Sequence, residues 1–135
     1  MQEIKKRRIL LASVLKPVDD PRMLEKIGSG LEQKYEVHIT GQPGHLDRHP
    51  SITFHTLRPF SRLSVARLFA PLNILKVVMI VKPAILIICT HELLSVALMA
   101  KILLRCKVVY DVQENYWQNI YYGKAFPSYL RPLVA

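Results

Sequence analysis

A histidine and a glutamate, His91 and Glu92, follow directly after a short apolar run at residues 84–88. A second polar group lies at the end of another apolar run that begins at Lys107, and it consists of Asp111, Glu114 and Asn115. Imidazole, carboxylate and amide groups all exchange hydrogen bonds with hydroxyl groups, which suits binding of a polyol such as a sugar. A lone His-Glu pair is also an ordinary way to start a helix, so its meaning depends on the surrounding elements.

The two apolar runs predict buried strands, because both are short and rich in β-branched side chains. Between them lies a long apolar stretch that predicts a well-packed helix, interrupted by Ser95, Lys101 and Arg105. Strand, helix and strand form a βαβ unit with parallel strands. Ligands of open parallel sheets bind beyond the carboxyl ends of the strands, so the two polar groups should share one edge. With Thr90 as N-cap, the helix dipole favours a neutral imidazole at position 91.

The rest of the chain predicts three more strands and two more helices. The strands are expected at Arg8–Leu15, Tyr35–Thr40 and, near a sheet edge, Ser51–Leu57. The helices are expected at Pro21–Lys34, after an Asp20 N-cap, and at Pro59–Val81, with Ser61 as N-cap and a bend or break at Pro71. Residues 1–135 therefore predict one α/β domain, an open parallel sheet of about five strands in the order 3-2-1-4-5 with helices on both faces.

The net charge of +9 is concentrated in the middle of the chain. Residues 58–107 carry eight basic side chains and one acidic side chain, whereas residues 1–57 carry nine and seven. The segment 59–81 resembles a basic amphipathic helix on an anionic membrane surface, with contacts from Arg58, Arg62, Arg67 and Lys76. An ordinary surface helix of a basic protein has the same pattern. Nucleic acid is not an expected partner, because the basic residues are not interleaved with aromatic ones.

The two cysteines, Cys89 and Cys106, are predicted to lie at opposite ends of adjacent strands. This separation exceeds the roughly 7 Å that a disulfide permits, so both should be free thiols in a reducing compartment. No uncharged apolar run approaches the roughly 18 residues of a membrane span, and no metal-ligand spacing is present. We therefore expect a cytoplasmic protein without a metal, with possible contact at the inner face of the membrane.

Four motifs that would indicate other proteins on this type of sheet are missing. The turn after the first strand, residues 13–17, contains no glycine, which excludes a dinucleotide fingerprint and a P-loop. A phospho-receiver would need an aspartate at the end of the third strand, where Thr56, Leu57 and Arg58 stand instead. No G-x-S-x-G elbow of a hydrolase is present.

Three stretches together resemble the amino-terminal half of family 4 glycosyltransferases, which are retaining enzymes with two facing Rossmann-like domains, the GT-B fold. They are KPVDDPRMLEKIGSGLEQKYEVHITG, CTHELLSVALMAKIL and KVVYDVQENY. The most specific parts are Asp20–Arg22 with the following helix, the His91-Glu92 pair, and Tyr110-Asp111-Val112-x-Glu114-Asn115. Gln113 stands where many relatives have histidine.

This resemblance implies transfer of a sugar from a nucleotide-sugar donor to a cell-envelope or polysaccharide acceptor. His91, the expected catalytic residue, would face the donor sugar, and Glu92 would help set the rim. Glu92, Asp111, Glu114 and Asn115 are the expected substrate-binding residues. The leaving phosphate would accept the acceptor's proton, and no metal or other cofactor would be needed. A second, carboxyl-terminal domain would hold the donor, so the 135 residues alone should be inactive, as the truncated half of a longer enzyme would be. The acceptor would be a sugar or a lipid-linked sugar.

An alternative of another class remains open. The chain could be a non-catalytic module that uses its basic surface, between Arg58 and Lys82, to dock on anionic lipid or on a protein.

Overall fold

The computed structural model describes residues 5–45, 49–61 and 63–112. Five strands form one sheet in the order β3-β2-β1-β4-β5, and every neighbouring pair is parallel. The strands are β1 (Arg7–Pro17), β2 (Tyr35–Gln42), β3 (Ile52–Thr56), β4 (Ile85–Ile88) and β5 (Lys107–Tyr110). The predicted strand order, the parallel sheet and the edge position of the third strand are confirmed, and the fold is a Rossmann-like α/β fold.

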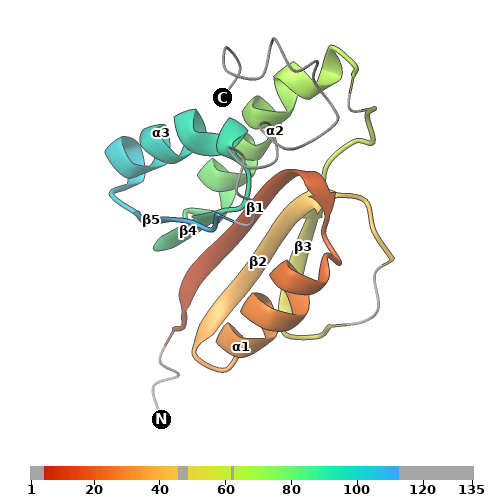
Figure 1. Cartoon of the computed structure of the whole chain (residues 1–135). Helices are drawn as coiled ribbons and strands as arrows, with labels where there is room; N and C mark the ends of the chain where they lie inside the picture. The colour runs from red at the N-terminus through yellow and green to blue at the C-terminus, as the bar shows by residue number, and fades with distance from the viewer. Residues whose placement is uncertain (1–4, 46–48, 62, 113–135) are drawn as a thin grey trace.

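Helices cover both faces of this sheet (Figure 1). The first helical segment joins a π-helix, η1 (Arg22–Gly28), to a short α-helix, α1 (Ser29–Leu31). The opposite face carries α2 (Ala66–Val81) and α3 (Leu94–Leu104), the latter preceded by a 3-10 turn, η2 (His91–Leu93). This arrangement agrees with the predicted helices on both faces.

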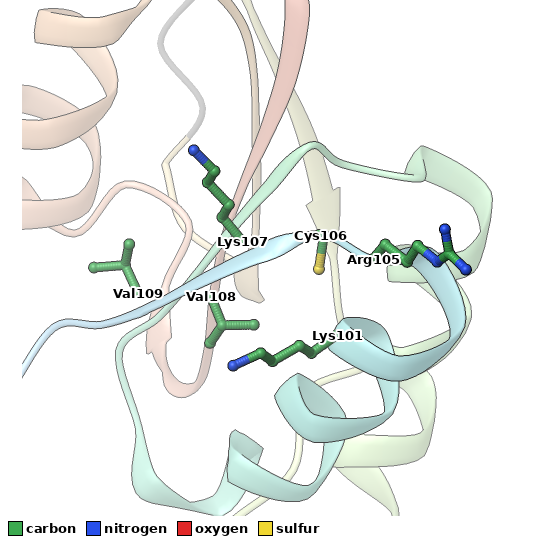
Figure 2. A pocket seen from close by; sticks show the side chains of 6 residues that line it. All are labelled: Lys101, Arg105, Cys106, Lys107, Val108 and Val109. Atoms are coloured by element: carbon green, nitrogen blue, oxygen red, sulfur yellow. The ribbon is translucent and has the colours of Figure 1, made fainter.

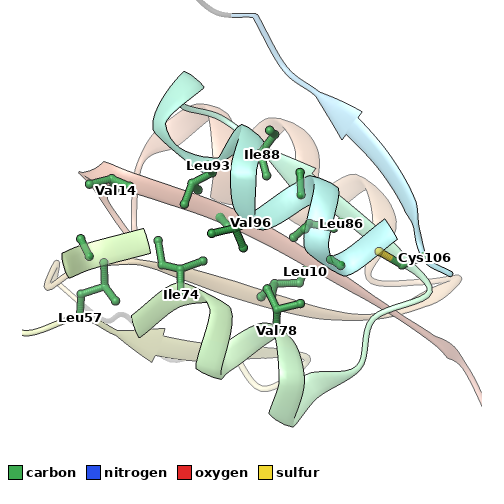
Figure 3. Close-up of a cluster of buried hydrophobic side chains, with 14 residues drawn as sticks. Leu10, Val14, Leu57, Ile74, Val78, Leu86, Ile88, Leu93, Val96 and Cys106 are labelled. Carbon is green, nitrogen blue, oxygen red and sulfur yellow. The ribbon is translucent and has the colours of Figure 1, made fainter. Parts of the chain in front are cut away.

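Alternating side chains of β1 divide the core into two layers. Leu10 and Val14 point toward α2 and α3, where they meet buried residues of both helices and of β4 (Figure 3). Ala12 belongs to the same buried cluster. Ile9 and Leu11 point the other way, into a cluster formed with the first helix and β2. Because successive side chains of a strand alternate between faces, the continuous apolar run Ile9–Ala12 of this central strand requires helices on both sides.

The helix predicted at Pro59–Val81 starts later than expected. Its first residue is Ala66, and Val65 rather than Ser61 holds the N-cap position, without a side-chain cap bond. Pro71 lies inside one continuous helix, so a break at this position was a wrong expectation. Proline removes one hydrogen bond, here near the helix start, and the turns that follow keep their own bonds.

Gly41 allows β1 and β2 to approach closely where their register becomes irregular, between Ala12 and Pro17. A Cβ atom at position 41 would lie 2.5 Å from the backbone oxygen of Lys16. Any other residue would therefore push the two strands apart. Gly28 has a related role in the first helix, since a Cβ there would lie 3.0 Å from the oxygen of Met23 and 3.4 Å from Ile39 Cδ1.

Candidate functional site

The carboxyl ends of β1, β4 and β5 form one edge of the sheet, as predicted. The residues Ala12, Ile88 and Tyr110 are in register across the three strands. Beyond them, the amide of Cys89 donates to the oxygen of Ala12, and the amide of Asp111 donates to the oxygen of Ile88, both at 2.9 Å. These bonds bring the segment that leads into His91 and the end of β5 to the same edge, which we call the rim.

His91 lies on the rim as an exposed side chain at the start of η2. Thr90 before it is extended and occupies the N-cap position, as expected, but its hydroxyl forms no cap bond. Instead, Thr90 Oγ1 accepts a hydrogen bond of 3.4 Å from the amide of Val14 in β1. The segment that carries His91 is thus tied to the central strand, while the imidazole itself lies at the surface.

Glu92 points toward α2 and pairs with Arg67. The guanidinium of Arg67 donates to Glu92 Oε1 from Nε at 2.8 Å, and Nη2 contacts the same oxygen. The second carboxylate oxygen, Oε2, is buried and has no hydrogen-bond partner among the described residues. Sequence reasoning assigned Glu92 to the substrate and Arg67 to an anionic surface, without linking them. A signal was available, since Glu92 is the only acidic residue among eight basic ones in 58–107.

Asp111 forms a bidentate ion pair with Arg22 across the rim. Arg22 Nε donates to Oδ2 at 2.8 Å, and Nη2 donates to Oδ1 at 2.6 Å. The hydrogen bond to Asp111 and the charge of Asp111 raise the pKa of Arg22 above its ordinary value. This pair joins the first helix to the end of β5, and it fixes the orientation of the Asp111 carboxylate.

The start of the first helix is occupied by the protein's own carboxylate. Asp20 Oδ1 accepts hydrogen bonds from the amides of Arg22 at 3.1 Å and Met23 at 3.2 Å. Its other oxygen lies 3.6 Å from Lys16 Nζ. The predicted capping role of Asp20 is therefore confirmed, and these two amides are not available to a phosphate group as they would be in a nucleotide-binding loop.

The two cysteines are free, as predicted, and both are buried. Burial, together with the nearby charge of Asp111, raises the pKa of the Cys89 thiol from 9.0 to about 12. Burial likewise raises the pKa of Cys106. Cys89 lies directly behind the rim, but its thiol stays protonated near neutral pH and cannot serve as a nucleophile there.

The remaining predicted contact residues are distributed as follows. Arg58 is exposed in the segment between β3 and α2, and Lys76 is exposed on α2. Glu114 and Asn115, expected on the rim, and Arg62, expected in the basic set, lie outside the described residues.

Within 5–45, 49–61 and 63–112 no group of three His, Cys, Asp or Glu side chains could hold a metal ion. In the same ranges, no helix has the length and apolar character needed to cross a membrane.

A pocket of about 610 Å³ lies at the opposite end of the sheet from the rim. Its lining comes from the end of α3 and the start of β5, and consists of Lys101, Arg105, Cys106, Lys107, Val108 and Val109. Figure 2 shows that Lys107 and Val109 lie on one side of β5, and Cys106 and Val108 on the other. The hollow therefore follows the edge of β5 that lies away from β4, and none of the predicted site residues that the structure describes lines it.

We compared the chain with protein-family models and with curated proteins. No family model matches it, and no curated protein is significantly similar to it.

Proposed function

We propose that the chain is the acceptor-side domain of a retaining glycosyltransferase of the family 4 type. In this proposal, a sugar moves from a nucleotide-sugar to a cell-envelope or polysaccharide acceptor. The observation that supports it most is the exposed imidazole of His91 at the carboxyl edge of a parallel sheet, beyond the end of β4. Asp111 lies on the same rim, at the end of the adjacent strand.

The ion pairs and hydrogen bonds of the rim fit a reaction in which no side chain of this domain acts as a general base. The carboxylates of Asp20, Glu92 and Asp111 each hold a cation or a helix start. Each is therefore committed to a structural contact and is poorly placed to take a proton from a substrate. Transfer in which the leaving phosphate accepts the acceptor's proton avoids this need. His91 would then bind the donor sugar through a hydrogen bond to a hydroxyl group, and Glu92 would shape the rim.

The donor phosphates are assigned to a second domain for a related reason. The Asp20 carboxylate already occupies the amides of Arg22 and Met23 at the start of the first helix. A diphosphate there would meet a negative charge instead of free N–H groups. A facing domain that supplies the donor site is therefore part of the proposal, and the 135 residues alone are expected to be inactive.

The test is a transfer assay with a panel of nucleotide-sugars, on the 135 residues and on a longer protein that includes the second domain. We expect nucleotide release only from the longer protein, and a loss of at least about tenfold in turnover with His91→Ala, the cost of one lost hydrogen bond to a substrate. His45→Ala is the matched control, because His45 is also exposed but lies in the loop after β2. Equal turnover of the two variants would remove His91 from the proposal.

A non-catalytic docking module is the second candidate, and the large apolar side chains exposed on α2 and α3 favour it. A longer protein that binds no nucleotide-sugar in calorimetry would decide for this candidate. Donor binding followed by turnover would decide against it.

A further inference from the structure

The helices α2 and α3 pack together on one side of the sheet (Figure 1). Both helices expose large apolar side chains. Ten of them are between 40% and 77% exposed: Leu68, Phe69, Leu72, Met79, Ile80, Leu94, Leu98, Met99, Ile102 and Leu103. We call these ten residues the outer surface of α2 and α3. Soluble proteins rarely leave so many large apolar side chains together in water, and such a patch marks an interaction site.

Cations accompany these apolar side chains without acidic partners. Lys76 and Lys101 are exposed on the two helices, and Lys82 and Arg105 end them. Among the described residues no acidic side chain pairs with any of the four. The only acidic residue from Ala66 to Arg105 is Glu92, and Arg67 pairs with it. The charge of this layer is therefore positive and calls for a negatively charged partner surface.

The residue types distinguish a lipid surface from a protein. Protein interfaces are enriched in aromatic side chains, methionine and arginine and depleted in lysine. The two helices contain Phe69, Met79 and Met99, but they lack tyrosine and tryptophan, and three of the four cations of this layer are lysines. Leucine and phenylalanine beside lysine are typical of helices that lie in the headgroup region, because the lysine stem is apolar and its ammonium reaches the phosphates.

We propose that the outer surface of α2 and α3 binds the surface of a bilayer that contains anionic phospholipid. The apolar side chains enter the boundary between headgroups and acyl chains, and Lys76, Lys82, Lys101 and Arg105 contact lipid phosphates. This assignment differs from the sequence-based one, because Arg67 is held by Glu92 and most of the contact is apolar. It does not depend on sugar transfer, and a non-catalytic module would bind in the same way.

The experiment is co-sedimentation of the 135-residue protein with vesicles of phosphatidylcholine, or of an equimolar mixture with phosphatidylglycerol. We expect binding to the mixed vesicles and little to phosphatidylcholine alone. Leu98→Ser with Ile102→Ser should lower the partition coefficient by about tenfold or more. The matched control is Val109→Ser with Val112→Ser, which are 48% and 60% exposed but lie outside the surface; it should partition like the wild type.

The contribution of charge is tested separately. Lys76→Gln with Lys101→Gln should weaken binding by about fivefold for each lysine. Lys26→Gln with Lys34→Gln removes the same charge from exposed positions near the first helix and should have a smaller effect.

Three outcomes would overturn the proposal. The first is a protein that stays in solution with anionic vesicles, and the second is equal partition of the wild type and the Leu98→Ser, Ile102→Ser variant. The third is a wild-type protein that is a dimer in ultracentrifugation and a variant that is a monomer, while vesicles bind neither. That result would assign the surface to a second copy.

A fluorescent label at Ser95→Cys gives an independent measurement if the serine variant does not fold. Its emission should shift to the blue on anionic vesicles, whereas a label at Lys26→Cys should not respond, and equal responses would also refute the proposal.

Discussion

Arg22 and Asp111 are 89 positions apart in the sequence, yet two hydrogen bonds of 2.8 and 2.6 Å join them across the rim. The pair connects the helix that follows β1 with the end of β5, on the far side of β4. Its two charges act in opposite directions on the thiol behind them, since Asp111 raises the pKa of Cys89 and Arg22 lowers it. Cys89 is therefore a natural reporter of the rim's charge balance.

Replacement of Asp111 by asparagine should lower the pKa of Cys89, because the negative charge that disfavours the thiolate is lost. The pKa should remain above the ordinary value, since burial is the larger cause. Carbon-13 labelling of the cysteine Cβ, followed through an alkaline titration, measures this directly. Glu25→Gln is the control, as Glu25 is exposed on η1. If both variants titrate at the same pH as the wild type, the electrostatic contact between Asp111 and Cys89 is absent in solution.

The same thiol should make the protein less stable in alkali. The pKa of Cys89 rises on folding from 9.0 to about 12, so the folded protein keeps a proton that the unfolded chain releases. This contribution to stability is complete below pH 9.0 and declines as the pH approaches 12, by about 1.4 kcal/mol per pH unit.

Cys89→Ala isolates this contribution. Its free energy of unfolding, from urea titrations at several pH values, should fall less steeply in alkali than that of the wild type. Cys106→Ala serves as the comparison, because the pKa of Cys106 is also raised although no nearby carboxylate contributes. A Cys89→Ala slope as steep as that of the wild type would mean that other groups cause the alkaline loss.

The sheet could be predicted from the sequence because each strand contains an apolar or alternating run between polar and turn-forming residues, and this pattern can be recognised without knowledge of tertiary contacts. The central position of β1 follows from its apolar run on both faces, and the edge position of β3 from its weaker pattern. The start of α2 was misplaced by several residues. Ser61 and Pro59 are good helix-start residues, but local preference did not decide where the chain turns to cover β1.

The rim was predicted as a place but not as a set of contacts. Strand ends follow from topology, which is why Cys89–Glu92 and Asp111 were expected together. The pairs Arg22–Asp111 and Arg67–Glu92 depend instead on side-chain reach across separate elements, and no spacing in the sequence encodes that reach. Asp111 and Glu92 were for this reason assigned to a substrate, whereas the structure shows both in ion pairs that join separate elements.

A second pH dependence of stability is expected from His38 on β2 and His55 on β3. His38 Nδ1 lies 3.0 Å from His55 Nε2. His38 Nε2 also lies 3.0 Å from a carboxylate oxygen of Glu36. If His38 donates its ring proton from Nε2 to Glu36, His38 Nδ1 must accept a hydrogen bond from His55 Nε2. Addition of a proton to both rings would therefore break the hydrogen bond between the two histidines.

Burial and the charge of His38 lower the pKa of His55 below its ordinary value of 6.5. A lowered pKa means that the folded protein resists protonation, so the stability is present above pH 6.5 and is lost as the pH falls below it. His55→Gln should therefore flatten the acid limb of a plot of unfolding free energy against pH. His45→Gln, at an exposed loop position, should leave that limb unchanged. Parallel acid limbs for the wild type and His55→Gln would contradict the expectation.

Two glycines in different surroundings give a last prediction: Gly41, where β1 and β2 approach closely, and Gly30 in the first helix. Gly41→Ala would place a Cβ atom 2.5 Å from the backbone oxygen of Lys16, and a backbone atom cannot move aside as a flexible side chain can. We expect a loss of about 1–3 kcal/mol in the free energy of unfolding, as for other overpacked sites. Gly30→Ala is the opposite case, because its Cβ would have no neighbour within 4 Å, and alanine in a helix is favoured over glycine by about 0.5–1 kcal/mol. The urea midpoint of Gly41→Ala should therefore lie below that of the wild type, and the midpoint of Gly30→Ala should lie above it. A Gly41→Ala protein as stable as the wild type would show that the strands can separate at this point without cost.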